Sequence, residues 1–217
     1  MGDDRLILAR LIGSRICHDL TSPVGAIQNG LELLTMMPSA GSGELAMISE
    51  SAVHASARLR FMRLAFGMAG TDHTAAAGEI VGILHDLGSG RRCAYHWTPD
   101  STTTRREVQE VFLAMLCLES ALPRGGDIRV TTPALTAMVG AAAAPGPPAG
   151  PAPRWQIAAP ATPTHPAPFL WETLKTGADA AQVQPDQVQF LLLYHLLAAR
   201  QTQVEMGMSD GQITLRL

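Results

Sequence analysis

Charged and aromatic residues are scarce in this chain of 217 residues, of which 16% are charged and 5% are aromatic. The net charge is -3, and no clustered basic excess is present, although contacts with nucleic-acid phosphates usually need one. No run approaches the ~20 apolar residues that cross a bilayer, and acids stand near the N-terminus where a signal peptide carries bases. We therefore expect no nucleic-acid partner, no membrane partner and a cytoplasmic location.

Cysteine is also rare, and its placement excludes two kinds of site. The three cysteines are Cys17, Cys93 and Cys117, and no two of them form a CxxC pair. One would stay unpaired in any disulfide scheme, which is typical of proteins in a reducing compartment. We therefore expect neither a disulfide scaffold nor a structural zinc site.

Two long amphipathic helices are predicted for the first third of the chain. Apolar residues recur at steps of three and four over residues 4–37 and again over residues 44–68. The sequence PSAGSG, residues 38–43, supplies a short turn that makes the two helices antiparallel neighbours. Two helices alone cannot cover both apolar stripes, so we expect a homodimer in which two hairpins form a four-helix bundle.

A second domain with mixed secondary structure is predicted after a linker, TDHTAAA, that follows Gly70. We divide the chain into a hairpin, residues 1–70, and an α/β domain, residues 78–217. Thr104 and Glu107 have the spacing of a capping box that opens a helix. Helices are predicted for residues 79–87, 104–121, 168–176 and 185–200, and strands for residues 91–98, 127–132, 135–139, 154–158, 203–208 and 212–217. The predicted fold class is α+β.

His18 is the candidate reactive residue of the first helix. At about 100° per residue, the apolar stripe lies roughly 160° to 240° away from His18, so its ring should point outward. The residues predicted to share its face are Leu11, Ser14, Arg15, Ser22, Gly25 and Asn29. A solvated histidine without a function is the alternative. Pro23 argues against it, because a proline inside a helix costs about 3 kcal/mol and needs a reason. An exposed neutral imidazole is a nucleophile that can hold a phosphoryl group.

The residues around His18 resemble a known family. The hexapeptide His18-Asp19-Leu20-Thr21-Ser22-Pro23 resembles the H-box of dimerising sensor histidine kinases. The wider run SRICHDLTSPVGAIQNGLELL, residues 14–34, resembles the ChpT-type histidine phosphotransferases of alphaproteobacteria. This resemblance implies that the second domain is a degenerate, ATPase-like α/β sandwich of the histidine-kinase kind.

The departures from the kinase pattern concern the nucleotide site. Aligning ALPRGG, residues 121–126, with the corresponding kinase segment puts Leu113 and Cys117 where two asparagines of the N-box would stand. Neither leucine nor a neutral thiol suits a hard cation such as Mg²⁺. No DxGxG run and no Walker motif follow. We therefore expect that this chain binds no ATP, no metal and no other cofactor.

The resemblance also implies a reaction and its partners. A phosphoryl group would pass from a receiver-domain aspartate to His18 and then to another receiver, and the receiver would supply Mg²⁺. Asp19 would assist His18, although a role as a solvated helix charge stays open. The docking face would comprise Leu11, Ser14, Arg15, Ser22, Gly25 and Asn29. The implied partners are the receiver domains of a CckA-like hybrid histidine kinase and of CtrA- and CpdR-like response regulators.

Three alternatives are left open by the sequence. A kinase-like dimeric scaffold would bind receivers without carrying phosphate, and an orphan kinase would take phosphate from ATP. A metal-dependent phosphohydrolase of the HD type is suggested only by His18-Asp19 together with His54, His73 and a second dipeptide, His85-Asp86. We interpret Arg58, Arg60 and Arg63 as a solvated face of the second helix that could attract an acidic receiver.

Overall fold

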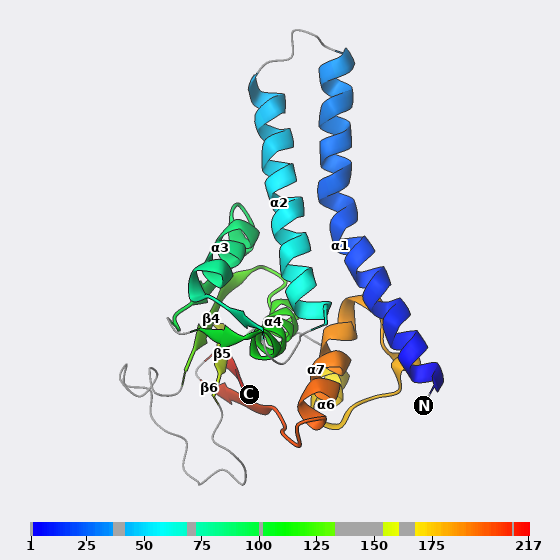
Figure 1. The fold of residues 1–217 in the computed structure, drawn as a ribbon, viewed down its shortest axis with the longest axis vertical. Coiled ribbons are helices and arrows are strands. Elements are labelled where there is room, and N and C mark those ends of the chain that lie inside the picture. The colour runs from blue at the N-terminus through cyan, green and yellow to red at the C-terminus, as the bar shows by residue number, and fades with distance from the viewer. Residues whose placement is uncertain are drawn as a thin grey trace.

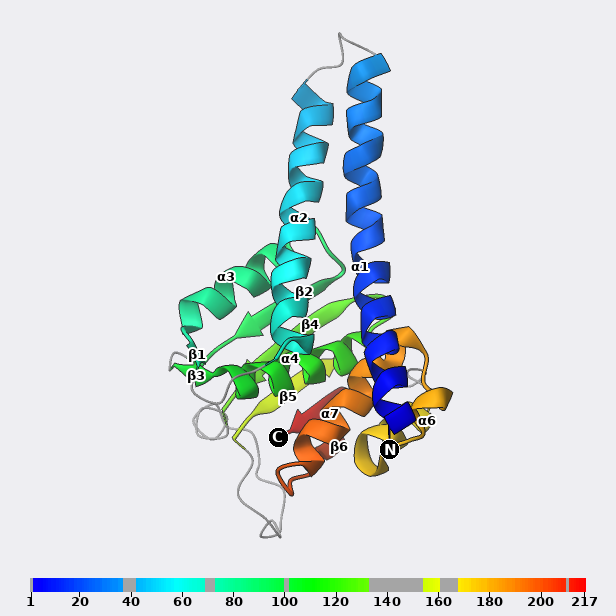
Figure 2. The same ribbon diagram turned by 45° about the vertical axis from the view of Figure 1, so that its right-hand side comes forward.

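The first third of the chain forms a helical hairpin that projects from the rest of the molecule (Figure 1). The computed structural model describes residues 2–36, 42–68, 73–99, 102–132, 154–160, 168–209 and 211–217. Helix α1 (Gly2–Met36) and helix α2 (Ser42–Phe66) lie side by side in both ribbon views (Figures 1 and 2). The predicted turn begins outside the described residues, whereas Ser42 and Gly43 already belong to α2. Both predicted helices are confirmed.

Gly30 sets the distance between the two helices of the hairpin. It is buried, and a Cβ atom at this position would lie 2.5 Å from Cγ1 of Ile48 on α2. Such a contact is too short for two carbon atoms, so any larger residue at this position would force the Ile48 side chain or the helix to shift. A Cβ on Gly25, by contrast, would meet no atom within 4 Å. Close packing inside the hairpin thus depends on Gly30, while Gly25 faces open space.

The remainder of the chain folds as a five-stranded sheet with helices packed on it, which confirms the α+β fold class. The sheet order is β2-β4-β5-β7-β6, in which β2 pairs with β4 in parallel and the other neighbours are antiparallel. Its strands are β2 (Cys93–Trp97), β4 (Gly126–Thr131), β5 (Gln156–Pro160), β6 (Glu205–Ser209) and β7 (Gln212–Arg216). The helices are α3 (Ala77–Gly88), α4 (Arg105–Ser120), α6 (Pro168–Thr176) and α7 (Val188–Ala198), with 3-10 turns η1 (Ala180–Gln182) and η2 (Pro185–Gln187).

Several predicted elements differ from the structure in detail. The helix predicted from Pro185 onward begins as the 3-10 turn η2 and becomes α-helical only at Val188. The predicted linker contains a short strand, β1 (Thr74–Ala75), that pairs with β3 (Thr103–Thr104). The strand predicted for residues 135–139 lies outside the described residues. The capping box of α4 is confirmed, because the Thr104 hydroxyl accepts from the Glu107 backbone N–H and the Glu107 carboxylate accepts from the Thr104 N–H.

Helix α4 joins the hairpin and the sheet in one hydrophobic core. All its residues from Glu107 to Leu118 are buried. Phe112 stacks on Phe61 of α2 with ring centroids 4.4 Å apart, while Ile128 and Ile157 of the sheet belong to the same core. Each such side chain gains about 1.5–3 kcal/mol from full burial. The base of the hairpin is therefore packed into the α/β part, and this packing places α1 and α2 next to the end of α4.

Candidate active site

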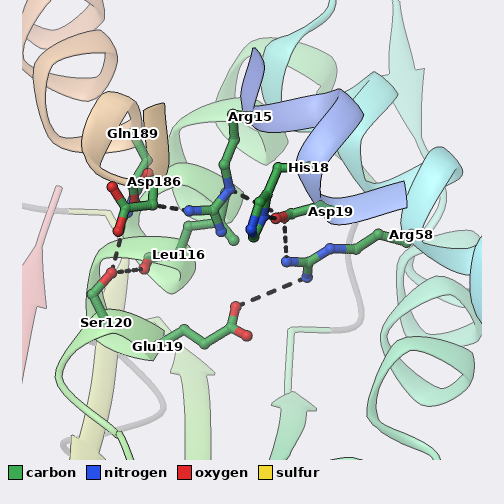
Figure 3. A network of polar contacts seen from close by, with 9 residues as sticks. All are labelled: Arg15, His18, Asp19, Arg58, Leu116, Glu119, Ser120, Asp186 and Gln189. Carbon is green, nitrogen blue, oxygen red and sulfur yellow. Dashed lines mark hydrogen bonds and ion pairs between the residues drawn. The ribbon is translucent and has the colours of Figure 1, made fainter. Parts of the chain in front are cut away.

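His18 lies on α1 with its side chain 82% exposed, as the helical periodicity predicts. Its Nδ1 atom is 3.2 Å from Oδ1 of Asp19 (Figure 3). Within the described part of the chain, its other ring nitrogen, Nε2, has no hydrogen-bond partner. One nitrogen of the ring is thus held by a carboxylate, and the other is open to an incoming molecule.

Asp19 is held by two arginines. Its side chain is only 8% exposed, and its Oδ2 atom accepts from Nε of Arg15 at 3.1 Å and from Nη2 of Arg58 at 2.5 Å. Burial alone would raise the pKa of Asp19, but the charges of Arg58 and Arg15 and hydrogen bonds from His18 and Arg58 lower it. Asp19 is therefore a carboxylate in a fixed orientation. The alternative of a solvated helix charge is wrong.

The interpretation of Arg58 as part of a solvated face is also wrong. Its side chain is 17% exposed and lies between Asp19 and Glu119 of α4, with Nη1 4.0 Å from Oε2 of Glu119. Burial would lower the pKa of Arg58, but Glu119 and Asp19 raise it. Arg58 precedes the buried Phe61 and Met62 by three and four residues, so helical spacing could have placed it on the packed side of α2. Arg63 is exposed, and the partly exposed Arg60 pairs with Asp86.

Fewer of the predicted docking residues are exposed in the structure than the sequence suggests. Ser14, Ser22 and Asn29 are exposed. Leu11, however, packs against Ala180, Val183 and Leu191 of the α/β part. The Arg15 side chain is 12% exposed and donates from Nη1 to the backbone oxygen of Asp186 at 2.8 Å. The prediction that Leu11 and Arg15 face a partner is therefore corrected, because this end of α1 packs on the chain's own α7 and 3-10 turns.

A cleft of about 490 Å³ adjoins His18 and separates the hairpin from part of the α/β domain. The hairpin side is lined by His18, Asp19, Ser22, Pro23, His54 and Arg58, and the other side by Leu87, Gly90, Arg91, Arg92, Cys93, Tyr95, Glu119 and Leu122. Burial above all, together with the nearby Glu119, raises the pKa of Tyr95, so its phenol stays neutral. Arginines from two sides make this cleft suitable for an acidic or phosphorylated group.

The two residues that our sequence alignment placed at the kinase metal-ligand positions lie inside the core. Leu113 and Cys117 have no exposed surface and share a core with Phe190 and Leu193 of α7. Burial raises the pKa of Cys117 well above its usual value, so the thiol is neutral. These two side chains pack against other apolar groups and do not line the cleft next to His18.

The second His-Asp dipeptide does not converge on His18 to form a metal site. Asp86 on α3 accepts from Nη2 of Arg60 at 2.7 Å and lies 3.4 Å from Nδ1 of its neighbour His85. Among the residues that the structure describes, no three histidine, cysteine, aspartate or glutamate side chains lie close enough to hold a metal ion. The geometry therefore gives the phosphohydrolase alternative no support.

A family model for the histidine phosphotransferase C-terminal domain matches residues 77–211, which begin at the first residue of α3. The chain belongs to the histidine phosphotransferase family. The resemblance read from the residues around His18 is thereby confirmed, although the matched region covers the α/β part and not His18 itself. None of the helices among the described residues of this histidine phosphotransferase is long and apolar enough to cross a membrane.

The proteins similar to this histidine phosphotransferase include a curated relative and a solved structure. Protein phosphotransferase ChpT from Brucella abortus (strain 2308) is 39% identical over 127 residues, which are 58% of this chain and 60% of ChpT. The similarity thus spans less than two thirds of that relative. A solved structure described as the 1.7 Å structure of a bacterial phosphotransferase has a TM-score of 0.70 and 27% identity. That match covers 97% of this chain and 95% of the solved one, hairpin included.

Proposed function

We propose that this protein relays a phosphoryl group between receiver-domain aspartates through a phosphohistidine at His18. The observation that supports the proposal most is the pairing of an exposed His18 ring with a buried, ionised Asp19. Family membership supports the same reaction class. The relay would connect a hybrid histidine kinase to response regulators, and by resemblance these are CckA-like, CtrA-like and CpdR-like.

Asp19 decides which nitrogen of His18 reacts. An ionised carboxylate can only accept hydrogen bonds, so the Nδ1 atom facing Asp19 carries the proton. The lone pair then resides on Nε2, which is the exposed nitrogen. Nε2 attacks the phosphorus of an aspartyl phosphate, the N–P bond forms, and the P–O bond to the departing carboxylate breaks. The positive charge left on the ring is balanced by Asp19, and the reverse sequence delivers the phosphoryl group to the next receiver.

The chain's own contribution is positioning, and the receiver brings Mg²⁺. Transfer of a phosphoryl group needs alignment and charge stabilisation more than covalent help from the protein. We propose that no ATP is used. The burial of Leu113 and Cys117 supports this, because they align with the residues that hold the metal in the kinases. The cleft beside His18 has one wall from the α/β domain, including Arg91, so we propose that this domain contacts the acidic receiver as well.

We also propose a homodimer, which the apolar surface of the hairpin supports. Large hydrophobic side chains that are 42% to 79% exposed line both helices beyond the shared core, and they are Val24, Leu31, Leu33, Met36, Leu45, Met47, Val53 and Leu59. A surface of this kind is typical of an interface with another copy.

The three cysteines are free, which supports a cytoplasmic location.

The test is transfer from a receiver domain carrying a radiolabelled aspartyl phosphate to the full chain. We expect acid-labile label on the protein, and we expect its loss in His18→Gln. The matched control is His85→Gln, because His85 is 79% exposed and also stands before an aspartate on a helix. Binding of the receiver without labelling would favour the scaffold, and labelling from ATP alone would favour the orphan kinase.

A further inference from the structure

We propose that Arg58 is a positioning residue for phosphotransfer, which acts through Asp19 to keep the proton of His18 on Nδ1 and the lone pair on Nε2. The inference rests on the proposed function for its effect on transfer. Its effect on the protonation of the ring can be measured without any transfer. The role does not require Arg58 to touch the phosphoryl group.

The two oxygens of Asp19 have separate partners (Figure 3). Oδ1 faces Nδ1 of His18 at 3.2 Å, while Oδ2 accepts from Arg58 at 2.5 Å and from Arg15 at 3.1 Å. The carboxylate can present Oδ1 to the ring only while Oδ2 stays in place. Fixing Oδ2 therefore fixes the hydrogen bond that selects the tautomer of His18.

Arg58 and Arg15 are not equivalent in this arrangement. Arg15 lies on α1 itself, four residues before Asp19, and its Nη1 atom is committed to the backbone oxygen of Asp186. Arg58 comes from α2 and makes the shorter contact with Asp19. Its other terminal nitrogen faces Glu119 of α4. The planar guanidinium is thus held from two sides, and it connects Asp19 to a helix other than its own.

Loss of Arg58 has a defined chemical consequence. Asp19 is 8% exposed, so a carboxylate with one fewer cation beside it must bind a proton more readily or turn toward water. A protonated or displaced Asp19 no longer acts as a fixed acceptor for Nδ1–H. The ring can then carry its proton on Nε2, and in that tautomer the exposed nitrogen has no lone pair for attack.

The chain contains an internal control for this arrangement. Arg60, two residues along α2, donates to Oδ2 of Asp86 at 2.7 Å, and Oδ1 of Asp86 lies 3.4 Å from Nδ1 of His85. The residue types and the atoms are the same as at His18, but none of these three residues lines the cleft beside His18. Arg60→Gln therefore removes the bond between a second arginine of α2 and an aspartate, here Asp86 of α3, without changing Asp19.

The experiment measures the ring tautomer and the transfer rate in the full chain. Nitrogen-15 chemical shifts of labelled histidines at about pH 8 report the share of His18 that carries its proton on Nδ1. We expect Arg58→Gln to lower this share and to slow transfer from a phosphorylated receiver about tenfold, the low end for residues that orient a reacting group. Arg58→Lys should recover part of both values because it keeps the charge. Arg60→Gln should match the wild-type protein in the His18 signal and in the rate.

A further variant separates a tautomer effect from a loss of packing between helices. Glu119→Gln removes the ion pair with α4 but leaves Arg58 on Asp19, so the Nδ1–H share of His18 should stay at the wild-type value. A fall as large as that in Arg58→Gln would overturn the proposal. So would an unchanged tautomer in Arg58→Gln.

A second comparison applies if Arg58→Gln does not fold, as judged by circular dichroism. Arg58→Lys is then compared with Arg60→Lys. An unchanged tautomer of His18 in Arg58→Lys overturns the proposal, and a reduced Nδ1–H share of His18 in that variant alone supports it. Absence of phosphohistidine in the wild-type protein counts against the proposed function alone.

Discussion

Asp19 combines the chemical role that we propose for it with a structural one. It accepts from His18 with one oxygen and from two arginines with the other, and it does so with little exposure to solvent. Removing its charge leaves Arg15 and Arg58 without the anion that they share. The stability of the protein should therefore depend on the ionisation of Asp19.

Asp19→Asn tests this dependence through pH. The folded-state pKa of Asp19 is lowered, so its ionisation stabilises the protein above the ordinary aspartate pKa of about 3.9, and this contribution is lost as the pH falls through the lowered value. We expect the variant to lose about 1–3 kcal/mol of unfolding free energy at pH 7 and progressively less below pH 4. Urea titrations at several pH values measure the difference. Equal losses at pH 7 and pH 3 would contradict the assignment.

At the scale of elements, α4 is the helix that positions the site, because it packs on α2 and carries Glu119 at its end. It is buried along most of its length, so its stability depends on packing and on a well-formed N-terminus. The capping box of Thr104 and Glu107 supplies hydrogen-bond acceptors for backbone N–H groups that have no partner within the helix. Arg154 pairs with the same Glu107 and ties the start of α4 to the segment before β5.

Thr104→Ala should therefore lower the unfolding free energy by about 1 kcal/mol, the usual cost of losing a threonine cap. The expected cause is the loss of the acceptor for the Glu107 backbone N–H. Urea-induced unfolding measured by circular dichroism gives the value. Thr35→Ala is the control, because Thr35 is exposed and bonds only the Glu32 carbonyl near the end of α1, so its change should stay within about 0.5 kcal/mol.

At the scale of the whole molecule, the hairpin and the α/β part cannot be treated as independent units. Phe61, Met62 and Leu64 of α2 are buried in the same core as the sheet. A chain cut after the hairpin would expose these side chains to water, so its transfer rate would report misfolding as well as a lost contact surface. Single substitutions in the full chain are the better test of what the α/β domain contributes.

The far half of the hairpin has the opposite character, since large apolar side chains such as Leu31, Met36 and Leu45 are more than half exposed in the single chain. We expect Leu45→Glu to shift the protein from a dimer to the 23.0 kDa monomer in sedimentation analysis, because a charge would be buried at the interface between copies. Val81→Glu is a matched control, since Val81 is also exposed, at 45%, but belongs to α3 and not to the apolar surface of the hairpin. A wild-type protein that sediments as a monomer would contradict the dimer.

The sequence by itself determined the features that depend on local periodicity and chemistry. The spacing of apolar residues gave the two long helices and the outward direction of His18, and the pair Thr104 and Glu107 gave the start of α4. The expectation that no nucleotide is bound stays a prediction, and it depends on Leu113 and Cys117, whose side chains are poor Mg²⁺ ligands. Each of these inferences needs only neighbours along the chain or the chemistry of one side chain.

Only the tertiary structure decided which side chains surround Asp19. Arg58 stands 39 positions after Asp19, and Glu119 follows on a third helix. Periodicity shows which side of a helix is polar, but it does not show which residue of another helix faces it. The same limit explains why Leu11 and Arg15 were predicted to face a partner although they pack on the chain's own α/β part. Contacts between helices depend on their relative position, and that position is set by the common core around α4.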